Sequence, residues 1–397
     1  MSREDTGGCC DERMKTICLA APRMMGNELE YVKQAFATNW IAPLGAFVNR
    51  LEDDICKRIG CGGAVALSSG TAAIHLALIE AGVKPGDIVF CSDMTFTASA
   101  NPIAYCGAKP VFIDCEPITF GMSPMALQKA FEMYKPKAVV VASIYGIPAQ
   151  LDELLKICQH YGVPMIEDST EVLGSTINSK YAGTFGKFGT FSFNGNKIIT
   201  TSGGGMLVSD DIKSIKHALH LATQAKESSD FYEHRELGYN YRLSNVSAAI
   251  GVGQLEKLDE LIELKHGIWD RYNRAFQRYE KYGVGMVQVP TRMTSNYWLS
   301  VLLLNDKSRT TPTDIVRSLR SKNIEARHIW KPLHTQELWK DTDFVKILPT
   351  PCSDWFFEHG VCLPSDVNMT EDEQEYVIDA VCSAIDWSIR LYYQQGY

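Results

Sequence analysis

Hydrophobic residues in the first half of the chain form short continuous runs separated by longer amphipathic stretches. The runs are rich in Val and Ile, as is typical of parallel strands buried on both faces, and the stretches between them show helical spacing. This alternation predicts an α/β fold with a mostly parallel sheet covered by helices. Strands are expected at 64–68, 88–92, 109–114, 137–143 and 164–168, and helices at 71–81, 97–105, from about Ser123, and at 151–161.

The pattern changes in the second half. Residues 245–279 carry apolar side chains at three- and four-residue spacing, which predicts a long helical region that leads out of the large domain. Residues 297–305 are typical of a strand, 311–323 of a helix with a Thr cap, and 370–393 of a C-terminal helix with an acidic first turn. A smaller α+β domain is therefore expected to follow the large one.

Length and charge narrow the class of protein. A chain of 397 residues is longer than one hydrophobic core usually supports, so we expect an N-terminal extension (1–24), a large domain (25–260) and a small C-terminal domain (261–397). The net charge of −8 and the lack of a Lys/Arg stripe argue against nucleic acid or an anionic membrane as partner. A small-molecule substrate is expected instead.

The cysteines and the N-terminus indicate a cytoplasmic location. Twelve cysteines, including adjacent Cys9 and Cys10, form neither metal-binding knuckles nor a dense disulfide framework, so reduced thiols are expected. The first residues are charged, and no apolar run is long enough to serve as a targeting or membrane-spanning segment. No metal site is expected either, because no neighbouring carboxylate or Cys completes a ligand set around His217 and His220.

Three segments at predicted strand ends are candidate site elements, because ligands of open parallel sheets bind at the carboxyl ends of the strands. In Ser68–Thr71 a strand end and a glycine lead directly into a helix, whose N-terminus can bind phosphate or simply carry an N-cap. Phe96 can stack on a flat ring or fill the core. Asp168 ends an apolar strand and needs a partner, either a protonated pyridine nitrogen or an ordinary cap or ion pair.

Lys197 is the fourth candidate. It lies on a run that resembles a strand, between aromatic and apolar residues and a glycine-rich turn at 202–205. Apolar neighbours such as Ile198 and Ile199 favour a neutral, nucleophilic amine, and the alternative is a strand-end lysine that reaches solvent. A phosphate cradle, a stacking aromatic, an aspartate and a lysine, in this order along an α/β domain, meet the needs of pyridoxal phosphate (PLP).

Several motifs make the resemblance to one family specific. The chain from about residue 25 to its C-terminus resembles the DegT/DnrJ/EryC1/StrS family of fold-type I PLP-dependent sugar aminotransferases. Three segments, NWIAPLG (39–45), GNKIITTSGGGM and HIWKPLHTQ (328–336), resemble members that aminate C4 of UDP-linked 4-keto-6-deoxy-N-acetylhexosamines of the bacillosamine and legionaminic type. The motifs that carry the family resemblance are SSGTAAIHLAL, DMTFTASANPI, IEDSTEVLGS, FGTFSFNGNKIITTSGGGM and LGYNYRLSNVSAAIGVGQLE.

The resemblance implies a role for each matching residue. Lys197 holds PLP covalently and later moves a proton, Asp168 contacts the pyridine nitrogen and Phe96 the ring. The nitrogen comes from an amino acid, expected to be L-glutamate, and passes to the nucleotide sugar in a second stage. Gly70, Thr71 and Ser192 surround the phosphate, and Asn240 comes from the partner subunit of a homodimer whose active site is shared. The candidate substrate contacts are Trp40, Glu171, Arg327, His328, Trp330 and His334.

The chain departs from the common family sequence at two places, and several alternative functions stay open. The frequent family sequence EDAA is here EDST, and a small Ser143 stands where a polar substrate contact is often found. Sugar 3-dehydration on this scaffold uses a histidine in place of Lys197, so the lysine favours amination. Amination at C3, or of a GDP- or dTDP-linked sugar, would leave fold and cofactor unchanged. A non-catalytic regulatory homologue is disfavoured because every cofactor position is filled.

Overall fold

A computed structural model describes residues 16–394 of the chain. Cys9, Cys10 and residues 1–15 of the predicted N-terminal extension lie outside the described residues. Ten cysteines lie within them, and no disulfide bond joins any two of these ten. None of the described helices is long and apolar enough to span a membrane.

The centre of the molecule is an eight-stranded sheet in which β9 alone runs antiparallel to its neighbours. The other strands are parallel, because helical crossovers connect them. The sequence prediction of a mostly parallel sheet is confirmed. In sheet order the strands are β1 (Gly63–Leu67), β9 (Gly205–Ser209), β8 (Phe188–Ser192), β5 (Met165–Asp168), β4 (Ala138–Ala142), β2 (Ile88–Ser92), β3 (Lys109–Ile113) and β14 (Phe344–Val345).

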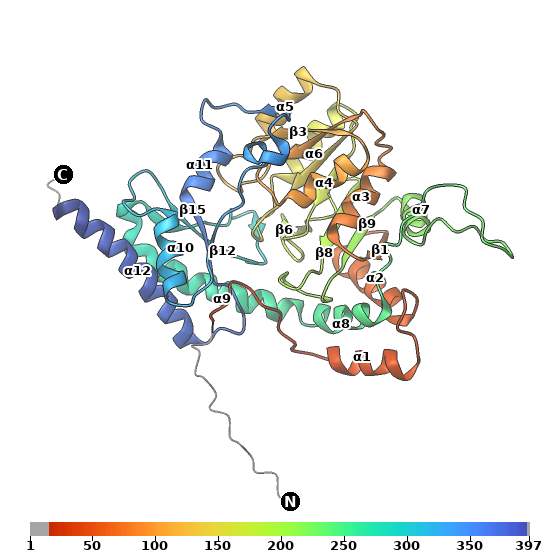
Figure 1. Cartoon of the computed structure of the whole chain (residues 1–397), viewed down its shortest axis with the longest axis horizontal. Helices are drawn as coiled ribbons and strands as arrows, with labels where there is room; N and C mark the ends of the chain where they lie inside the picture. The colour runs from red at the N-terminus through yellow and green to blue at the C-terminus, as the bar shows by residue number, and fades with distance from the viewer. Residues whose placement is uncertain (1–15, 395–397) are drawn as a thin grey trace, which may run out of the picture.

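Helices cover both faces of this sheet (Figure 1). Strand β4 shows why its apolar run is continuous: Val139 and Val141 pack in one core with residues of α5 and α6, and Val140 packs in the opposite core with residues of α3. Ser69 and Ser123 cap α3 and α5 by accepting backbone N–H bonds. The helices around the sheet are α2 (Ala46–Ile59), α3 (Gly70–Glu80), α4 (Asn101–Tyr105), α5 (Pro124–Met133), α6 (Leu151–His160) and α7 (Ile212–Ala222).

Two predicted helices are interrupted. The region 97–105 is a 3₁₀ turn, η1 (Thr97–Ser99), followed by the short α4, whose second residue is Pro102. The region 245–279 is two α-helices, α8 (Asn245–Leu255) and α9 (Leu258–Phe276), and then the 3₁₀ helix η2 (Gln277–Tyr282). Helix α8 packs against α2 and α1 (Glu28–Ala37), whereas α9 packs against β10 and α12, although buried residues of both helices belong to one hydrophobic core.

The C-terminal part forms a second, four-stranded antiparallel sheet beside α9 to α12 (Figure 1). Its helix α10 begins with the expected Thr cap, because Thr311 and Asp314 form a capping box. Strand β14 nevertheless joins the large sheet, and the division at residue 260 stays a prediction. The elements here are β10 (Val284–Met286), β12 (Ser300–Leu304), β13 (Arg327–His328), β15 (Gly360–Leu363), α10 (Pro312–Ser321), α11 (Cys352–His359) and α12 (Glu371–Gln394). A small third sheet comprises β6 (Thr176–Ile177), β7 (Lys180–Tyr181) and β11 (Met293–Thr294).

Candidate active site

A cavity of about 310 Å³ opens at the carboxyl edge of the parallel strands, where ligands of such sheets bind. All three strand-end segments that the sequence singled out contribute to its wall. Nine predicted site residues line it together, which are Gly70, Thr71, Phe96, Asp168, Glu171, Ser192, Lys197, Arg327 and Trp330.

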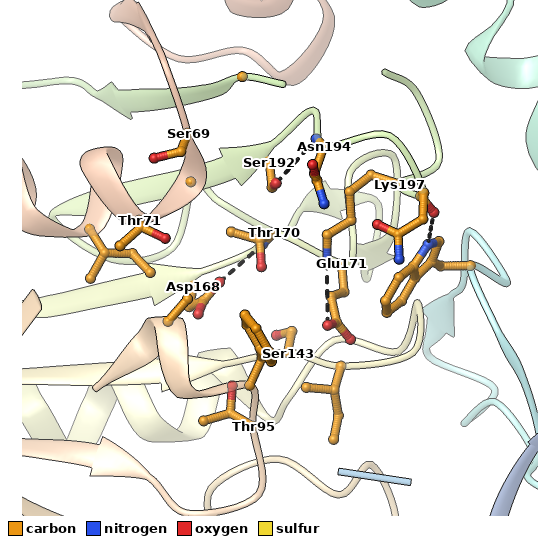
Figure 2. Close-up of a pocket in the computed structure, with 18 of the residues that line it drawn as sticks. Ser69, Thr71, Thr95, Ser143, Asp168, Thr170, Glu171, Ser192, Asn194 and Lys197 are labelled. Carbon is orange, nitrogen blue, oxygen red and sulfur yellow. Dashed lines mark hydrogen bonds and ion pairs between the residues drawn. The ribbon is translucent and has the colours of Figure 1, made fainter. Parts of the chain in front are cut away.

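The N-terminus of α3 forms one side of the cavity (Figure 2). Ser69 caps the helix by accepting the Ala72 N–H. Gly70 and Thr71 are the first two residues of the helix, so their N–H groups do not make intrahelical bonds. A Cβ on Gly70 would lie 3.1 Å from the Ser192 Cβ and 3.0 Å from the Thr170 Cγ2. The glycine therefore lets the helix start approach β8 closely, and this brings together backbone N–H groups and hydroxyls of the kind that can bind an anion.

Asp168 ends β5 and is buried at 4% exposure. Its Oδ2 accepts a 2.5 Å hydrogen bond from the Ser99 Oγ, and its Oδ1 accepts the Thr170 N–H at 3.3 Å. The Ser99 hydroxyl in turn bonds the Thr95 hydroxyl at 2.7 Å. These partners are neutral, so the carboxylate can still receive a cationic group from the cavity that it lines.

Lys197 lies on a loop, not on a strand as its sequence pattern indicated. Strand β8 ends at Ser192, and the chain then loops over residues 193–204 before β9 begins. This loop carries the lysine into the cavity, where its Nζ lies 3.4 Å from the Glu171 Oε1 and 4.1 Å from the centroid of the Trp298 ring (Figure 2). The side chain is 13% exposed, so it is not a lysine that reaches bulk solvent.

Glu171 is the carboxylate nearest the lysine amine. Its other oxygen accepts the Tyr145 N–H at 2.9 Å, which fixes the orientation of the group. Burial raises the pKa of Glu171, although the positive charge of Lys197 opposes this shift. Lys197 and Glu171 thus form a pair that can hold a proton between the amine and the carboxylate.

The C-terminal part of the chain closes the other side of the cavity. Arg327, on β13, is exposed and lines the cavity together with Trp330. Phe96 is 52% exposed and contacts the Trp330 ring at a centroid distance of 5.2 Å. Ser143 lines the cavity too, and its Oγ accepts the Ala149 N–H at 3.0 Å.

Four predicted site residues do not line this cavity. His328 lines a smaller adjoining cavity of about 150 Å³ that shares Arg327 and Trp330 with the first. Trp40 is exposed between α1 and α2, and Asn240 pairs with Thr223 in an isolated bridge near α7. His334 bonds Asp93 and Asp354 instead of facing the cavity. Their roles toward a substrate or a partner subunit stay predictions.

Sequence reasoning missed several residues of the site. Ser99 was hidden in a predicted helix, and only the sheet brings its hydroxyl to Asp168. Trp298 was assigned to a strand, yet it precedes β12 and contacts Lys197. Asn196, beside the lysine, lines both cavities and has a buried Oδ1 without a hydrogen-bond partner. Its nearness to Lys197 in the sequence was the one signal available.

The histidine pair on α7 has partners that its local sequence did not reveal. His217 bonds Glu80 at 2.6 Å and Glu236 at 3.1 Å, and His220 lies 3.4 Å from Glu236. Distant segments of the chain thus supply two carboxylates next to the pair. Across residues 16–394 there is no group of three or more His, Cys, Asp or Glu side chains arranged to hold a metal ion.

Comparison with protein families matches residues 22–382 to the DegT/DnrJ/EryC1/StrS aminotransferase family. The chain is 50% identical over 374 residues to EpsN of Bacillus subtilis, named as a putative pyridoxal phosphate-dependent aminotransferase, and the match covers 92% of this chain and 95% of that protein. It is 33% identical to a GDP-perosamine synthase of Caulobacter vibrioides, over 93% of this chain and 97% of that one.

Solved structures agree with this family match. The aminotransferase TlmJ of Streptoalloteichus hindustanus superposes with a TM-score of 0.84 at 28% identity, and the match covers 93% of this chain and 98% of that chain. PseC of Helicobacter pylori superposes with a TM-score of 0.85 at 22% identity, over 94% of this chain and all of that chain, which supports the fold alone. The predicted fold class is thus confirmed.

Proposed function

Because this chain belongs to the DegT/DnrJ/EryC1/StrS aminotransferase family and is a PLP-dependent sugar aminotransferase, we propose that it aminates C4 of a UDP-linked 4-keto-6-deoxy-N-acetylhexosamine with L-glutamate as the donor. The observation that carries the proposal is the position of Lys197, whose amine enters the cavity beside Glu171 and faces a space bounded by Asp168 and the start of α3.

The residues present fit the cofactor. Gly70, Thr71 and Ser192 offer N–H and hydroxyl donors to a phosphate, at a helix N-terminus that has room only because residue 70 has no side chain. A carboxylate oxygen of Asp168 can accept a hydrogen bond from a protonated ring nitrogen, and Phe96 offers an aromatic face. When bound, PLP supplies an electron sink that lets a proton leave the carbon next to the transferred nitrogen.

The protein's own groups handle the protons. Lys197 Nζ, once released from the cofactor, is the base that takes a proton from the amino-acid donor and returns one to C4 of the sugar. Glu171 balances the charge of the amine when it is protonated and accepts from it at 3.4 Å. The Asp168 carboxylate would hold the proton on the ring nitrogen, and the Ser99 hydroxyl orients that carboxylate.

The sugar and nucleotide rest on sequence similarity. Three motifs, NWIAPLG, GNKIITTSGGGM and HIWKPLHTQ, support the UDP-linked N-acetylhexosamine class, and the 50% identity to EpsN shows no conflict with it. A GDP-linked sugar is the second candidate, because GDP-perosamine synthases share 32–33% identity over nearly the whole chain. The nucleotide separates the two candidates.

A homodimer with a shared active site is part of the proposal. Exposed apolar side chains gather on α1 and the segment after it, and a surface of this kind is typical of a protein interface. We expect Asn240 and Trp40 of one subunit to reach the site of the other. The exposed residues are Leu29, Phe36, Trp40, Ile41 and Leu44.

The dimer is tested by light scattering and by complementation. Lys197→Ala and Asn240→Ala variants would each be impaired, and mixed subunits would regain activity because one site in the heterodimer is intact. A monomer in solution, or no recovery after subunit exchange, would refute the shared site.

The substrate assignment is tested with purified protein, PLP, L-glutamate and a panel of UDP-, GDP- and dTDP-linked 4-keto sugars, with products identified by mass and NMR. We expect a 4-amino-N-acetylhexosamine from the UDP-linked substrate. Amination of the GDP-linked sugar alone would establish the second candidate, and amination of only a 3-keto sugar would overturn the C4 assignment. Failure with every sugar would revive the non-catalytic alternative.

A further inference from the structure

His334 belongs to a buried cluster that ties the C-terminal part of the chain to the loop after β2. Its Nδ1 lies 2.8 Å from the Asp93 Oδ2, and its backbone N–H donates to the Asp93 Oδ1 at 2.9 Å. The backbone N–H of Leu333 donates to the Asp93 carbonyl at 3.0 Å, so one aspartate receives three bonds from two consecutive residues. Asp93 itself is fully buried.

Other groups hold the imidazole in place. Its Nε2 lies 3.4 Å from the Asp354 Oδ1, and the ring stacks on Phe344 of β14 with a centroid distance of 3.9 Å and an interplanar angle of 3°. Ser353 donates a third side-chain bond to Asp93 at 2.7 Å. Although burial opposes the charged form, the hydrogen bond and charge of Asp93 raise the pKa of His334. The cluster thus joins β14, α11 and the loop after β2.

Asp93 connects directly to the groups that orient Asp168. Its carbonyl accepts the Thr95 N–H at 3.1 Å, and the Thr95 hydroxyl bonds the Ser99 hydroxyl at 2.7 Å. Ser99 gives its own proton to Asp168, so the Thr95 hydroxyl must donate to Ser99. Phe96 lies within the same short loop. An anchor at Asp93 therefore sets both the carboxylate and the aromatic face of the cavity.

We propose that His334 is a positioning residue: clamped between Asp93 and Asp354, it fixes residues 93–99 and thereby orients Asp168 and Phe96 toward the cofactor. This assigns the histidine to the support of the site and not to contact with substrate. The inference rests on the proposed function in one respect, namely that Asp168 meets the ring nitrogen.

The chain offers a matched control in His359. It is 19% exposed against 16% for His334, bonds the carbonyl of Trp355, lies 3.2 Å from Asp306 and stacks on the Trp355 ring at 4.3 Å. It has the same kind of surroundings and, like His334, does not line the cavity, but it makes no bond to residues 93–99. A general loss of packing should affect both histidines alike.

The experiment compares His334→Gln with His359→Gln. For His334→Gln we expect roughly tenfold weaker PLP binding to the apoenzyme, the order expected for one hydrogen bond to a charged group. The absorption of bound PLP should respond differently to pH, and kcat should fall while KM for the nucleotide sugar stays within about twofold. His359→Gln should lower thermal stability alone. A raised KM with unchanged kcat would instead make His334 a substrate contact, and unchanged PLP affinity and spectrum would leave it a merely structural residue.

Two further variants test the route and guard against misfolding. Ser99→Ala removes the hydrogen bond to Asp168, which is the last step of the route from His334. If both residues act through this route, the double variant with His334→Gln should weaken PLP binding by less than the product of the two single effects. An effect equal to that product would refute the coupling. Asp354→Asn removes only the more exposed partner and should give a smaller change in the same direction. The wild-type response to L-glutamate tests the proposed function separately, since its absence would refute amino transfer, whatever the variants do.

Discussion

Two lysines contact Trp298, one buried and one at a cavity wall, and their surroundings differ in a way that bears on function. Lys265, on α9, donates to the carbonyls of Trp298 and Ser365, and burial lowers its pKa to about 8 against the opposing charge of Asp366. Lys197, on a loop, lies against the Trp298 ring and Glu171 at the wall of a cavity.

The comparison shows that burial alone does not identify a reactive lysine. A depressed pKa would select Lys265, whose amine is occupied by backbone carbonyls and does not line the site cavity. What distinguishes Lys197 is an amine that faces open space among complementary groups. Variants in the loop that carries Lys197 can therefore be compared with matched variants in α9, which carries Lys265.

The largest effect is expected from Lys197→Ala. Loss of the base and of covalent attachment should lower kcat by at least about a thousandfold and abolish the visible absorption band of lysine-bound PLP. Absorbance spectra and product assays check both. Lys265→Met, the matched variant in α9, should keep the band, and the comparison breaks down if the two variants behave alike.

Lys265→Met should act on stability instead. Its two carbonyl partners lose their donor, so the free energy of unfolding should fall by about 2 kcal/mol at pH 9. Between pH 8 and 10 the folded wild type loses the Lys265 proton while the unfolded chain keeps it, so wild-type stability should rise with pH relative to the variant, by up to about 3 kcal/mol. Urea denaturation across this range measures the difference, and a constant difference would contradict the low pKa.

Glu171→Gln should have a smaller effect on catalysis. The amide can still accept the Tyr145 N–H, but it no longer balances the charge of Lys197, so kcat should fall roughly tenfold while PLP stays bound. Because burial raises the pKa of Glu171, the acidic limb of the pH–kcat profile should also change in the variant. Kinetics at several pH values test this, and an unchanged profile would mean that the carboxylate takes no part.

The smallest effects come from a pair of glycines. Gly70→Ala would place a Cβ 3.0 Å from Thr170 and 3.1 Å from Ser192, so PLP affinity should fall a few-fold, by about 1 kcal/mol. Gly267→Ala, on α9, meets nothing within 4 Å and should raise the free energy of unfolding by about 0.5–1 kcal/mol without changing PLP affinity. PLP titration and denaturation distinguish the two, and equal affinities would argue against close packing at the start of α3.

Much of the large sheet was predictable because its strands are buried on both faces. Strand β2 has the predicted bounds 88–92, and α6 begins at Leu151 as expected. Prediction was poorer where local patterns compete: the apolar run before Lys197 continues the strand pattern past Ser192, although β8 ends there. Pairing of Ser192 with Gly205 opens the loop at that point, and this pairing is a contact between segments that the local pattern does not encode.

The sequence by itself determined the α/β class, the family and the order of Gly70, Phe96, Asp168 and Lys197, because buried strand patterns and contiguous motifs are local properties. Only the tertiary structure decided which polar partners complete the site. Ser99 bonds Asp168 across 69 residues and His334 bonds Asp93 across 241, since the sheet and the C-terminal segments bring them together. Hydrogen bonds depend on distance and direction in space, so such partners become visible only once the chain is folded.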